Sequence, residues 1–283
     1  MVGTGVAARH GILIKDAEGL ERAHHANVVV FDKTGTRAEG RPAVDQLVAA
    51  EGVRDEVLLR LAASAQQGSE HPLARAVLSR AQEQALPLIP VESFRSIAGR
   101  GLEAVLDGHA LTIGSRRLME ESGVELAALV ERAHILESQG RTLMWVAEGG
   151  RLLGLIAVTD PVKPSAIEAV RRLKEMGISS VMLTGDNRRA AQAVADAVGI
   201  DRVVAEVLPE DKAAEVERLK AEGLTVAMVG DGVNDAPALA AAHIGIAMGT
   251  GTDIAMHTAG ITLMRGDPAL LPAALSISRA TYN

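Results

Sequence analysis

Cysteine is absent from the 283 residues, which excludes disulfide bonds, zinc–cysteine sites and catalysis by a thiol. Aromatic residues are scarce: one tryptophan, one tyrosine and two phenylalanines. Because 48% of the residues are nevertheless hydrophobic, the core has to be built from aliphatic side chains and close backbone contacts. This composition suits an α/β protein with a buried parallel sheet, and the length suffices for two domains.

An excess of positive charge is also lacking, since the formal net charge is -7 and lysines and arginines form no run. We therefore expect no binding to nucleic acid or to an anionic membrane surface. No stretch approaches 18 uninterrupted apolar residues, and the first five residues lack the basic and then apolar pattern of a signal peptide. The sequence predicts that this chain by itself is soluble.

The C-terminal part alternates short β-rich runs with helical patterns. The helix expected between Ser165 and Met176 has one apolar face, on which we place Ile167, Val170, Leu173 and Met176. Such a βαβ rhythm predicts an α/β fold with a doubly wound parallel sheet. The expected strands are Ser180–Leu183, Val203–Ala205, Thr225–Val229, Ile244–Ala247 and Ile261–Leu263.

The middle of the chain has a different pattern and predicts an inserted α+β domain with an antiparallel sheet. Helical patterns come first, and short extended runs and a hairpin around Glu148-Gly-Gly-Arg151 follow. Turn residues mark both boundaries, at Gly40-Arg-Pro42 and Asp160-Pro-Val-Lys-Pro164. We expect residues 1–40 and 160–283 to form one domain and residues 41–159 the other.

The most informative segment is the apolar run Val28–Phe31 followed by Asp32-Lys-Thr-Gly-Thr36. A buried strand that ends at Asp32 presents this carboxylate at the ligand-binding edge of an open α/β sheet. Glycine and small polar residues next to it supply N–H and hydroxyl groups that can surround a phosphoryl group. The alternative is that Asp32 only ends a strand and begins a turn, as most such aspartates do.

Asp32-Lys-Thr-Gly-Thr36 resembles the phosphorylation signature of P-type ATPases, which belong to the haloacid dehalogenase superfamily. Three further motifs of these ATPases occur in the same order: Thr184-Gly-Asp-Asn187, Pro209-Glu-Asp-Lys212 and Gly230-Asp-Gly-Val-Asn-Asp-Ala-Pro237. Each lies at the end of an expected strand or at the start of a helix. The resemblance implies a haloacid-dehalogenase-like phosphorylation domain that carries an inserted nucleotide-binding domain.

The resemblance also implies the chemistry. Carboxylates are ionised at neutral pH, so Asp32 could attack the γ-phosphorus of ATP without a base. Mg²⁺ would be held by Asp32, Asp231 and the carbonyl of Thr34, with support from Asp235. The phosphoryl oxygens would meet a lysine, a hydroxyl group and an amide. The catalytic set implied is Asp32, Lys33, Thr34, Thr184, Gly185, Asp186, Lys212, Asn234 and Asp235.

Residue 34 argues against a first alternative, a soluble phosphatase of the same superfamily with a cap domain. Such phosphatases usually carry a second aspartate two residues after the nucleophile, where it serves as general acid and base. Thr34 occupies that position, so an acyl phosphate should persist. A second alternative is a nucleotide-binding module that forms no acyl phosphate.

The inserted domain carries residues that resemble the nucleotide-binding signature of the heavy-metal subgroup. These are Glu70 and His71 within Ser69-Glu-His-Pro-Leu-Ala74, and the pair Gly99 and Gly101. A histidine could stack on adenine or hydrogen-bond to it, and glycines let a backbone approach a ligand closely. Ser115 stands where this subgroup typically has asparagine, and Arg37-Ala38 stands where the family has Leu-Thr.

The rest of a transporter is not seen in the sequence. It has no Thr-Gly-Glu motif of an actuator domain and no membrane helices, so the resemblance implies a catalytic fragment at the cytoplasmic face of a membrane protein. The start, Val2 to Lys15, and the end, Leu271 to Asn283, are expected to be cytoplasmic extensions of the membrane helices that would flank this fragment. The implied cargo is a soft metal ion, with Cu⁺ favoured by the segment Gly260–Pro268 and with Zn²⁺ and Cd²⁺ left open.

Overall fold

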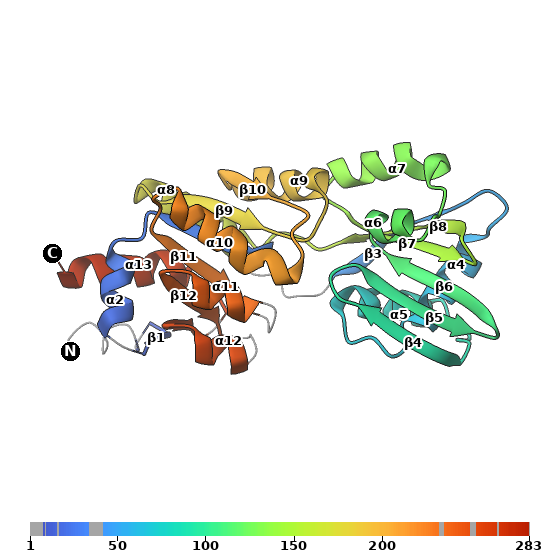
Figure 1. The fold of residues 1–283 in the computed structure, drawn as a ribbon, viewed down its shortest axis with the longest axis horizontal. Coiled ribbons are helices and arrows are strands. Elements are labelled where there is room, and N and C mark those ends of the chain that lie inside the picture. Colours follow the sequence, from blue (N-terminus) through green and yellow to red (C-terminus); the bar gives the residue numbers. More distant parts are fainter. Residues whose placement is uncertain are drawn as a thin grey trace. The chain divides into compact units, whose positions relative to one another are not determined.

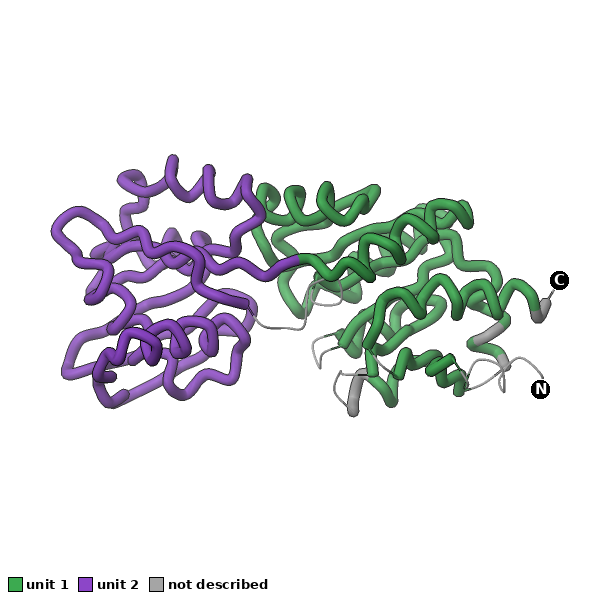
Figure 2. The backbone as a smooth tube through the Cα atoms, turned by 180° about the vertical axis from the view of Figure 1, so that it is seen from behind, with its two compact units in different colours: residues 1–39, 162–283 green, residues 40–161 purple. Residues whose placement is uncertain are grey.

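The computed structural model describes residues 8, 10–15, 17–33, 42–231, 235–249, 253–264 and 266–282. The chain divides into two compact units, one formed by residues 1–39 and 162–283 and the other by residues 40–161 (Figure 2). We call them unit 1 and unit 2. Among the described residues, no helix is both long enough and apolar enough to span a bilayer.

Unit 1 is built on a seven-stranded sheet with the order β1-β13-β12-β11-β2-β9-β10 (Figure 1). All neighbouring strands are parallel except β1, which runs antiparallel to β13. The chain passes from β2 to β9 on one side and returns to β11 on the other side, so β2 lies at the switch point of the sheet. The strands are β1 Ile12–Ile14, β2 Val28–Asp32, β9 Ser179–Leu183, β10 Arg202–Val204, β11 Val226–Gly230, β12 Ile244–Met248 and β13 Ile261–Leu263.

Helices cover both faces of this sheet, and alternate residues of β2 point into two separate cores. Val29 and Phe31 belong to a core with α8, α9 and α13, whereas Val28 and Val30 belong to a core with α10 and α11. A strand that is buried on both faces reads as a continuous apolar run, as β2 does. The helices of unit 1 are α2 Ala17–His24, α8 Pro164–Glu175, α9 Arg188–Val198, η1 Pro209–Asp211, α10 Lys212–Ala221, α11 Ala236–Ala241, α12 Asp253–Thr258 and α13 Leu270–Tyr282.

One expectation for unit 1 was wrong. Ile167 is 43% exposed, and α8 instead buries a face that contains Ala166, Val170 and Leu173. Alanines complete this face because they let the helix pack closely on the sheet, which a count of large apolar residues misses. Near the two ends of the chain, Ile12 in β1 and Leu271 in α13 are buried in the core of unit 1.

Unit 2 has a six-stranded antiparallel sheet with the order β3-β8-β7-β6-β5-β4. The first strand, β3, was not expected from the sequence. A β-bulge between Val44 and Gln46 interrupts the alternation of apolar and polar residues there, and alternation is the signal by which a strand is recognised. The strands are β3 Ala43–Ala49, β4 Val91–Ile97, β5 Gly101–Leu106, β6 His109–Gly114, β7 Thr142–Glu148 and β8 Arg151–Thr159.

Two pairs of helices enclose the sheet of unit 2. Buried residues of α4 and α5 pack on one face, where Leu102 and Ile113 point, and residues of α6 and α7 pack around Trp145 on the other. The helices are α4 Asp55–Ala65, α5 Pro72–Glu83, α6 Arg116–Glu121 and α7 Ala127–Ser138. A doubly wound, mostly parallel sheet followed by an antiparallel sheet in the inserted segment confirms the predicted fold class.

Candidate active site

Three adjacent strands of unit 1 deliver acidic and hydroxyl side chains to one edge of the sheet. Asp32 ends β2, Thr184 follows β9, and Asp231 follows β11. Because β2 pairs in parallel with both neighbours, Asp32 lies beside Leu183, and Phe31 lies beside Val229. The carboxyl ends therefore meet, which is the place where open α/β sheets bind ligands.

Lys212 connects two carboxylates of this edge. Its Nζ donates a hydrogen bond to Asp32 Oδ1 at 2.7 Å and another to Asp235 Oδ1 at 2.7 Å. All three side chains are largely buried, with exposed fractions of 12% for Lys212, 8% for Asp32 and 3% for Asp235. This lysine is the first residue of α10 and directly follows the short turn Pro209–Asp211.

The pKa of Lys212 shows which effect prevails in this cluster. Burial favours the neutral amine and lowers the pKa, but the charges of Asp32 and Asp235 and their hydrogen bonds outweigh burial. The result is a pKa raised from 10.5 to about 12. Lys212 is thus a fixed cation at neutral pH, as a group that stabilises phosphoryl oxygens has to be.

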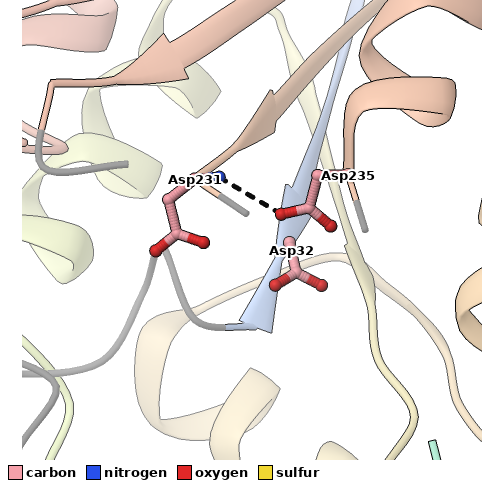
Figure 3. A group of neighbouring side chains, drawn as sticks. All are labelled: Asp32, Asp231 and Asp235. Atoms are coloured by element: carbon pink, nitrogen blue, oxygen red, sulfur yellow. Dashed lines mark hydrogen bonds between the residues drawn. The ribbon is translucent and has the colours of Figure 1, made fainter. Parts of the chain in front are cut away.

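Asp235 also contacts the backbone at the end of β11. Its Oδ2 accepts a hydrogen bond from the backbone N–H of Asp231 at 3.2 Å (Figure 3). Its side chain comes so close to Gly230 that a Cβ on that glycine would lie 2.7 Å from Asp235 Cβ. Gly230 is therefore required for this arrangement, although the sequence motif alone did not single it out as a site residue.

The three carboxylates at this edge suit a divalent cation. Asp32, Asp231 and Asp235 each offer an oxygen, and these oxygens lie within 4.8 Å of one another (Figure 3). Three carboxylates against the single ammonium of Lys212 leave an excess of two negative charges. Hard oxygen ligands with this charge excess fit Mg²⁺ better than a soft metal ion.

A second ion pair lies next to the first one. Lys33, the residue after Asp32, pairs with Asp186, and both side chains are mostly buried. The backbone N–H of Asp186 donates to Thr184 Oγ1 at 3.1 Å, so the hydroxyl hydrogen of Thr184 can be directed to another acceptor. Gly185 between them is exposed, and a Cβ on it would lie 3.3 Å from Val207 O.

Not every predicted site residue can be placed. Thr34 and Asn234 lie outside the described residues, as do Arg37 and Ala38. The predicted hydrogen bonds of Asn234 and the Mg²⁺ contact of the Thr34 carbonyl therefore stay predictions. The described candidates for the catalytic set, in contrast, gather at one edge of one unit.

In unit 2, His71 and Ser115 begin helices. His71 Nδ1 accepts a hydrogen bond from Leu73 N at 3.2 Å at the start of α5, and Ser115 Oγ accepts one from Leu118 N at 3.2 Å at the start of α6. These N-caps satisfy helix N–H groups that would otherwise have no partner. Accepting through Nδ1 leaves the ring proton of neutral His71 on Nε2. Glu70, just before it, is exposed, and its backbone carbonyl accepts from Arg75.

Close packing of two strands requires glycine at position 101, which the sequence did not reveal. It pairs with Gly114 across β5 and β6, and a Cβ at Gly101 would lie 2.1 Å from Ile113 O and 2.6 Å from Gly114 Cα. Gly99 in the preceding turn has a φ of 68°, which favours glycine. Both glycines are thus accounted for by backbone geometry, and a ligand contact would be an additional role.

Comparisons with known proteins agree with the fold. The haloacid dehalogenase-like hydrolase family matches residues 26–243. The chain is 49% identical over 283 residues to a copper-exporting P-type ATPase of Legionella pneumophila and covers 38% of it. It is 47% identical over 281 residues to a copper-exporting P-type ATPase of Bacillus subtilis and covers 35% of that protein. The chain thus spans about a third of these relatives' length, and they confirm the resemblance to P-type ATPases.

Two solved structures are similar over almost the whole chain. A zinc-transporting PIB-type ATPase in an E2.Pi state has a TM-score of 0.68 at 40% identity, with 99% of this chain and 45% of that one covered. The catalytic domain of the CPx-ATPase CopB-B has a TM-score of 0.76 at 27% identity, with 96% and 98% covered. The similarity to a separate catalytic domain extends over both units.

Proposed function

Since the chain belongs to the haloacid dehalogenase-like hydrolase family, we propose that it is the ATP-using catalytic part of a heavy-metal-transporting P-type ATPase. In this proposal the phosphorylation domain is formed by residues 1–40 and 160–283, close to the bounds of unit 1, and the nucleotide-binding domain by residues 41–159, close to those of unit 2. The observation that carries the proposal is the position of Asp32, at the end of a central strand with its carboxylate bonded to Lys212. From the relatives we also propose that the whole protein exports Cu⁺.

The proposed reaction is transfer of the γ-phosphoryl group of ATP to Asp32. A carboxylate oxygen forms the new bond to phosphorus, while the bond between phosphorus and the β,γ-bridging oxygen breaks and ADP leaves with the electron pair. No proton has to move, because the nucleophile is already an anion. Lys212 neutralises charge on the phosphoryl oxygens, and the hydroxyl group of Thr184 donates a hydrogen bond to one of them.

Mg²⁺ would be held by Asp32 and Asp231, with Asp235 orienting the loop through the Asp231 N–H group. When bound, it would offset the negative charge of the triphosphate and of the carboxylates. The ammonium group of Lys212 does not replace it, because one positive charge cannot balance three carboxylates. Each residue of this step belongs to unit 1.

Unit 2 would bind the adenine nucleotide through Glu70, His71, Gly99, Gly101 and Ser115. The ring of His71 is held at the start of α5 by its Nδ1 hydrogen bond, which orients the Nε2–H group for a ligand. Ser115 is already engaged as an N-cap, so its contribution to the nucleotide would be secondary.

The test is incubation with γ-³²P-labelled ATP and Mg²⁺, followed by acid quenching and treatment with hydroxylamine, which cleaves acyl phosphates. We expect a hydroxylamine-sensitive label on Asp32 that Asp32→Asn abolishes. Steady release of phosphate from small phosphoesters with no label would favour the soluble phosphatase. Binding of ATP without any label would indicate a nucleotide-binding module instead.

A further inference from the structure

Three residues other than glycine have a positive φ in the described part of the chain: Ala85, Asp107 and Glu206. Ala85 follows the end of α5, and Asp107 precedes Gly108 in the hairpin between β5 and β6. Left-handed backbone is ordinary at both kinds of position. Glu206, with a φ of 61°, has no such explanation, because it lies between β10 and the turn that leads to Lys212.

The backbone around Glu206 is bonded to the loop that carries two of the candidate catalytic residues. Glu206 N donates to Asp186 O at 2.9 Å, and Val207 N donates to Thr184 O at 3.1 Å. Thr184 N in turn donates to Val204 O at 3.0 Å. These hydrogen bonds extend the pairing of β9 with β10 into the loops beyond the strands.

The side chain of Glu206 takes no part in packing, since it is exposed. The next residue, Val207, is buried in the same core as Val216 and Leu219 of α10. A left-handed residue at position 206 thus lets the chain bond to the loop of Thr184 and then enter the core. Any residue with a Cβ disfavours this conformation, and β-branched residues disfavour it most.

We propose that Glu206 is a positioning residue of the phosphoryl-transfer site. Its left-handed backbone holds the loop before α10 against Thr184 and Asp186, and this attachment sets Lys212 between Asp32 and Asp235. The role in catalysis rests on the function proposed above, whereas the attachment of the two loops can be tested without it.

The decisive variants alter backbone preference and charge separately. Glu206→Val removes the charge and disfavours a positive φ, Glu206→Ala removes only the carboxylate, and Glu206→Gly favours a positive φ. Glu210→Val is the matched control, because Glu210 is an exposed glutamate of the same segment and is not among the residues with a positive φ. All four are made in the full chain.

We expect Glu206→Val to slow formation of the acyl phosphate by about ten- to a hundredfold, the range that follows from a small displacement of a catalytic group. The ATP concentration for half-maximal labelling should stay unchanged, because Lys212 is not a proposed nucleotide-binding residue. Glu206→Ala, Glu206→Gly and Glu210→Val should label at rates within about threefold of the wild type, since each keeps a backbone that can adopt the required φ.

Amide hydrogen exchange tests the attachment independently of the reaction. The N–H groups of Glu206 and Val207 should exchange slowly in the wild type and in Glu206→Gly, and quickly in Glu206→Val. If the wild type formed no acyl phosphate, the proposed function would fail while this readout still decided the role of Glu206 in the fold. Should Glu206→Val not fold, Glu206→Gly remains decisive, with an expected rise in Tm of about 2–4 °C.

Three results would overturn the inference. The first is equal rates for Glu206→Val and Glu210→Val, which would show that φ at position 206 has no influence. The second is a loss in Glu206→Ala as large as in Glu206→Val, which would assign the role to the carboxylate. The third is a lower Tm in Glu206→Gly than in the wild type.

Discussion

The two units hold their candidate residues in opposite ways. In unit 1, the charged groups hold one another: Lys212 bonds two buried carboxylates, and Lys33 pairs with Asp186. In unit 2, each described candidate has a local structural task, as a helix cap at His71 and Ser115 or as a point of close strand approach at Gly101. A substitution in unit 1 therefore breaks contacts among the candidate residues themselves, whereas one in unit 2 disturbs a local element of the fold, unless the replacement keeps the local task.

The largest effect is expected from Lys212→Ala. It leaves Asp32 and Asp235 buried without their cation, which should cost about 3–5 kcal/mol of stability in the absence of Mg²⁺. Formation of the acyl phosphate should fall by about 10²- to 10³-fold, as when one stabilising donor is removed from a reaction centre. Urea unfolding and labelling with γ-³²P-labelled ATP measure the two losses.

Lys174→Ala is the control, since Lys174 is an exposed lysine of α8 and its loss should change stability by no more than about 0.5 kcal/mol. ATP binding measured by calorimetry should be unchanged in both variants. A loss of ATP binding in Lys212→Ala would contradict the separation of tasks between the units.

The corresponding disruption of unit 2 is Gly101→Ala. The added methyl group would overlap Ile113 O and Gly114 Cα, so strands β5 and β6 have to separate, at a cost of about 1–3 kcal/mol. Gly108→Ala is the control, because Gly108 also has a positive φ but no atom of the described residues lies within 4 Å of its missing Cβ. The difference in urea midpoint between the two variants measures the overlap together with the difference in backbone strain between a φ of 148° and one of 76°, and equal midpoints would refute the overlap.

Two substitutions at Ser115, with smaller expected effects, separate its role in folding from a role in nucleotide binding. Ser115→Ala removes the N-cap of α6 and should cost about 1 kcal/mol of stability. Ser115→Asn keeps a capping oxygen and adds an amide donor, so stability should be unchanged. One additional hydrogen bond to ATP is worth about 0.5–1.5 kcal/mol, a rise in affinity of about two- to twelvefold. Unchanged ATP binding by Ser115→Asn would show that this position does not contact the nucleotide.

The comparison also explains what the sequence could predict. The meeting of Asp32, Thr184 and Asp231 follows from topology, because carboxyl ends of neighbouring parallel strands share one edge. The βαβ rhythm of the C-terminal part and the short extended runs with a hairpin in the middle of the chain were sufficient to predict both sheet types. Regular periodicity and strand-end motifs are local signals, so they can be read from a single sequence.

What could not be predicted depends on contacts between distant segments. The bulge in β3, the exposure of Ile167 and the approach of Gly101 to Gly114 each result from packing against a partner strand or sheet. The two hydrogen bonds of Lys212 reach Asp32, 180 positions away in the sequence, and Asp235, 23 positions away. The left-handed backbone at Glu206 has no sequence signal, because glycine or asparagine would be the usual indication.

The smallest expected effect concerns two groups of unit 1 that can carry positive charge, Lys212 and His243. Lys212 lies among carboxylates and its pKa is raised, whereas burial, together with the charges of Lys220 and Arg22, lowers the pKa of His243 below 6.5. His243 precedes β12, at the opposite edge of the sheet from Asp32, and its Nδ1 accepts from Val226 N at 3.0 Å. A fully protonated imidazole could not accept that hydrogen bond.

The sign of the resulting pH dependence follows from this lowered pKa. Above the unfolded-state value of about 6.5, both states hold a neutral ring, and His243 adds no pH dependence. As the pH falls through 6.5, the unfolded chain takes up the proton first, so stability decreases until the folded pKa is passed. His243→Asn, whose amide oxygen can still accept from Val226 N, should reduce this loss in urea unfolding between pH 8 and pH 5. His257→Gln, at an exposed site, should retain the dependence, and an unchanged slope in His243→Asn would mean that another group titrates.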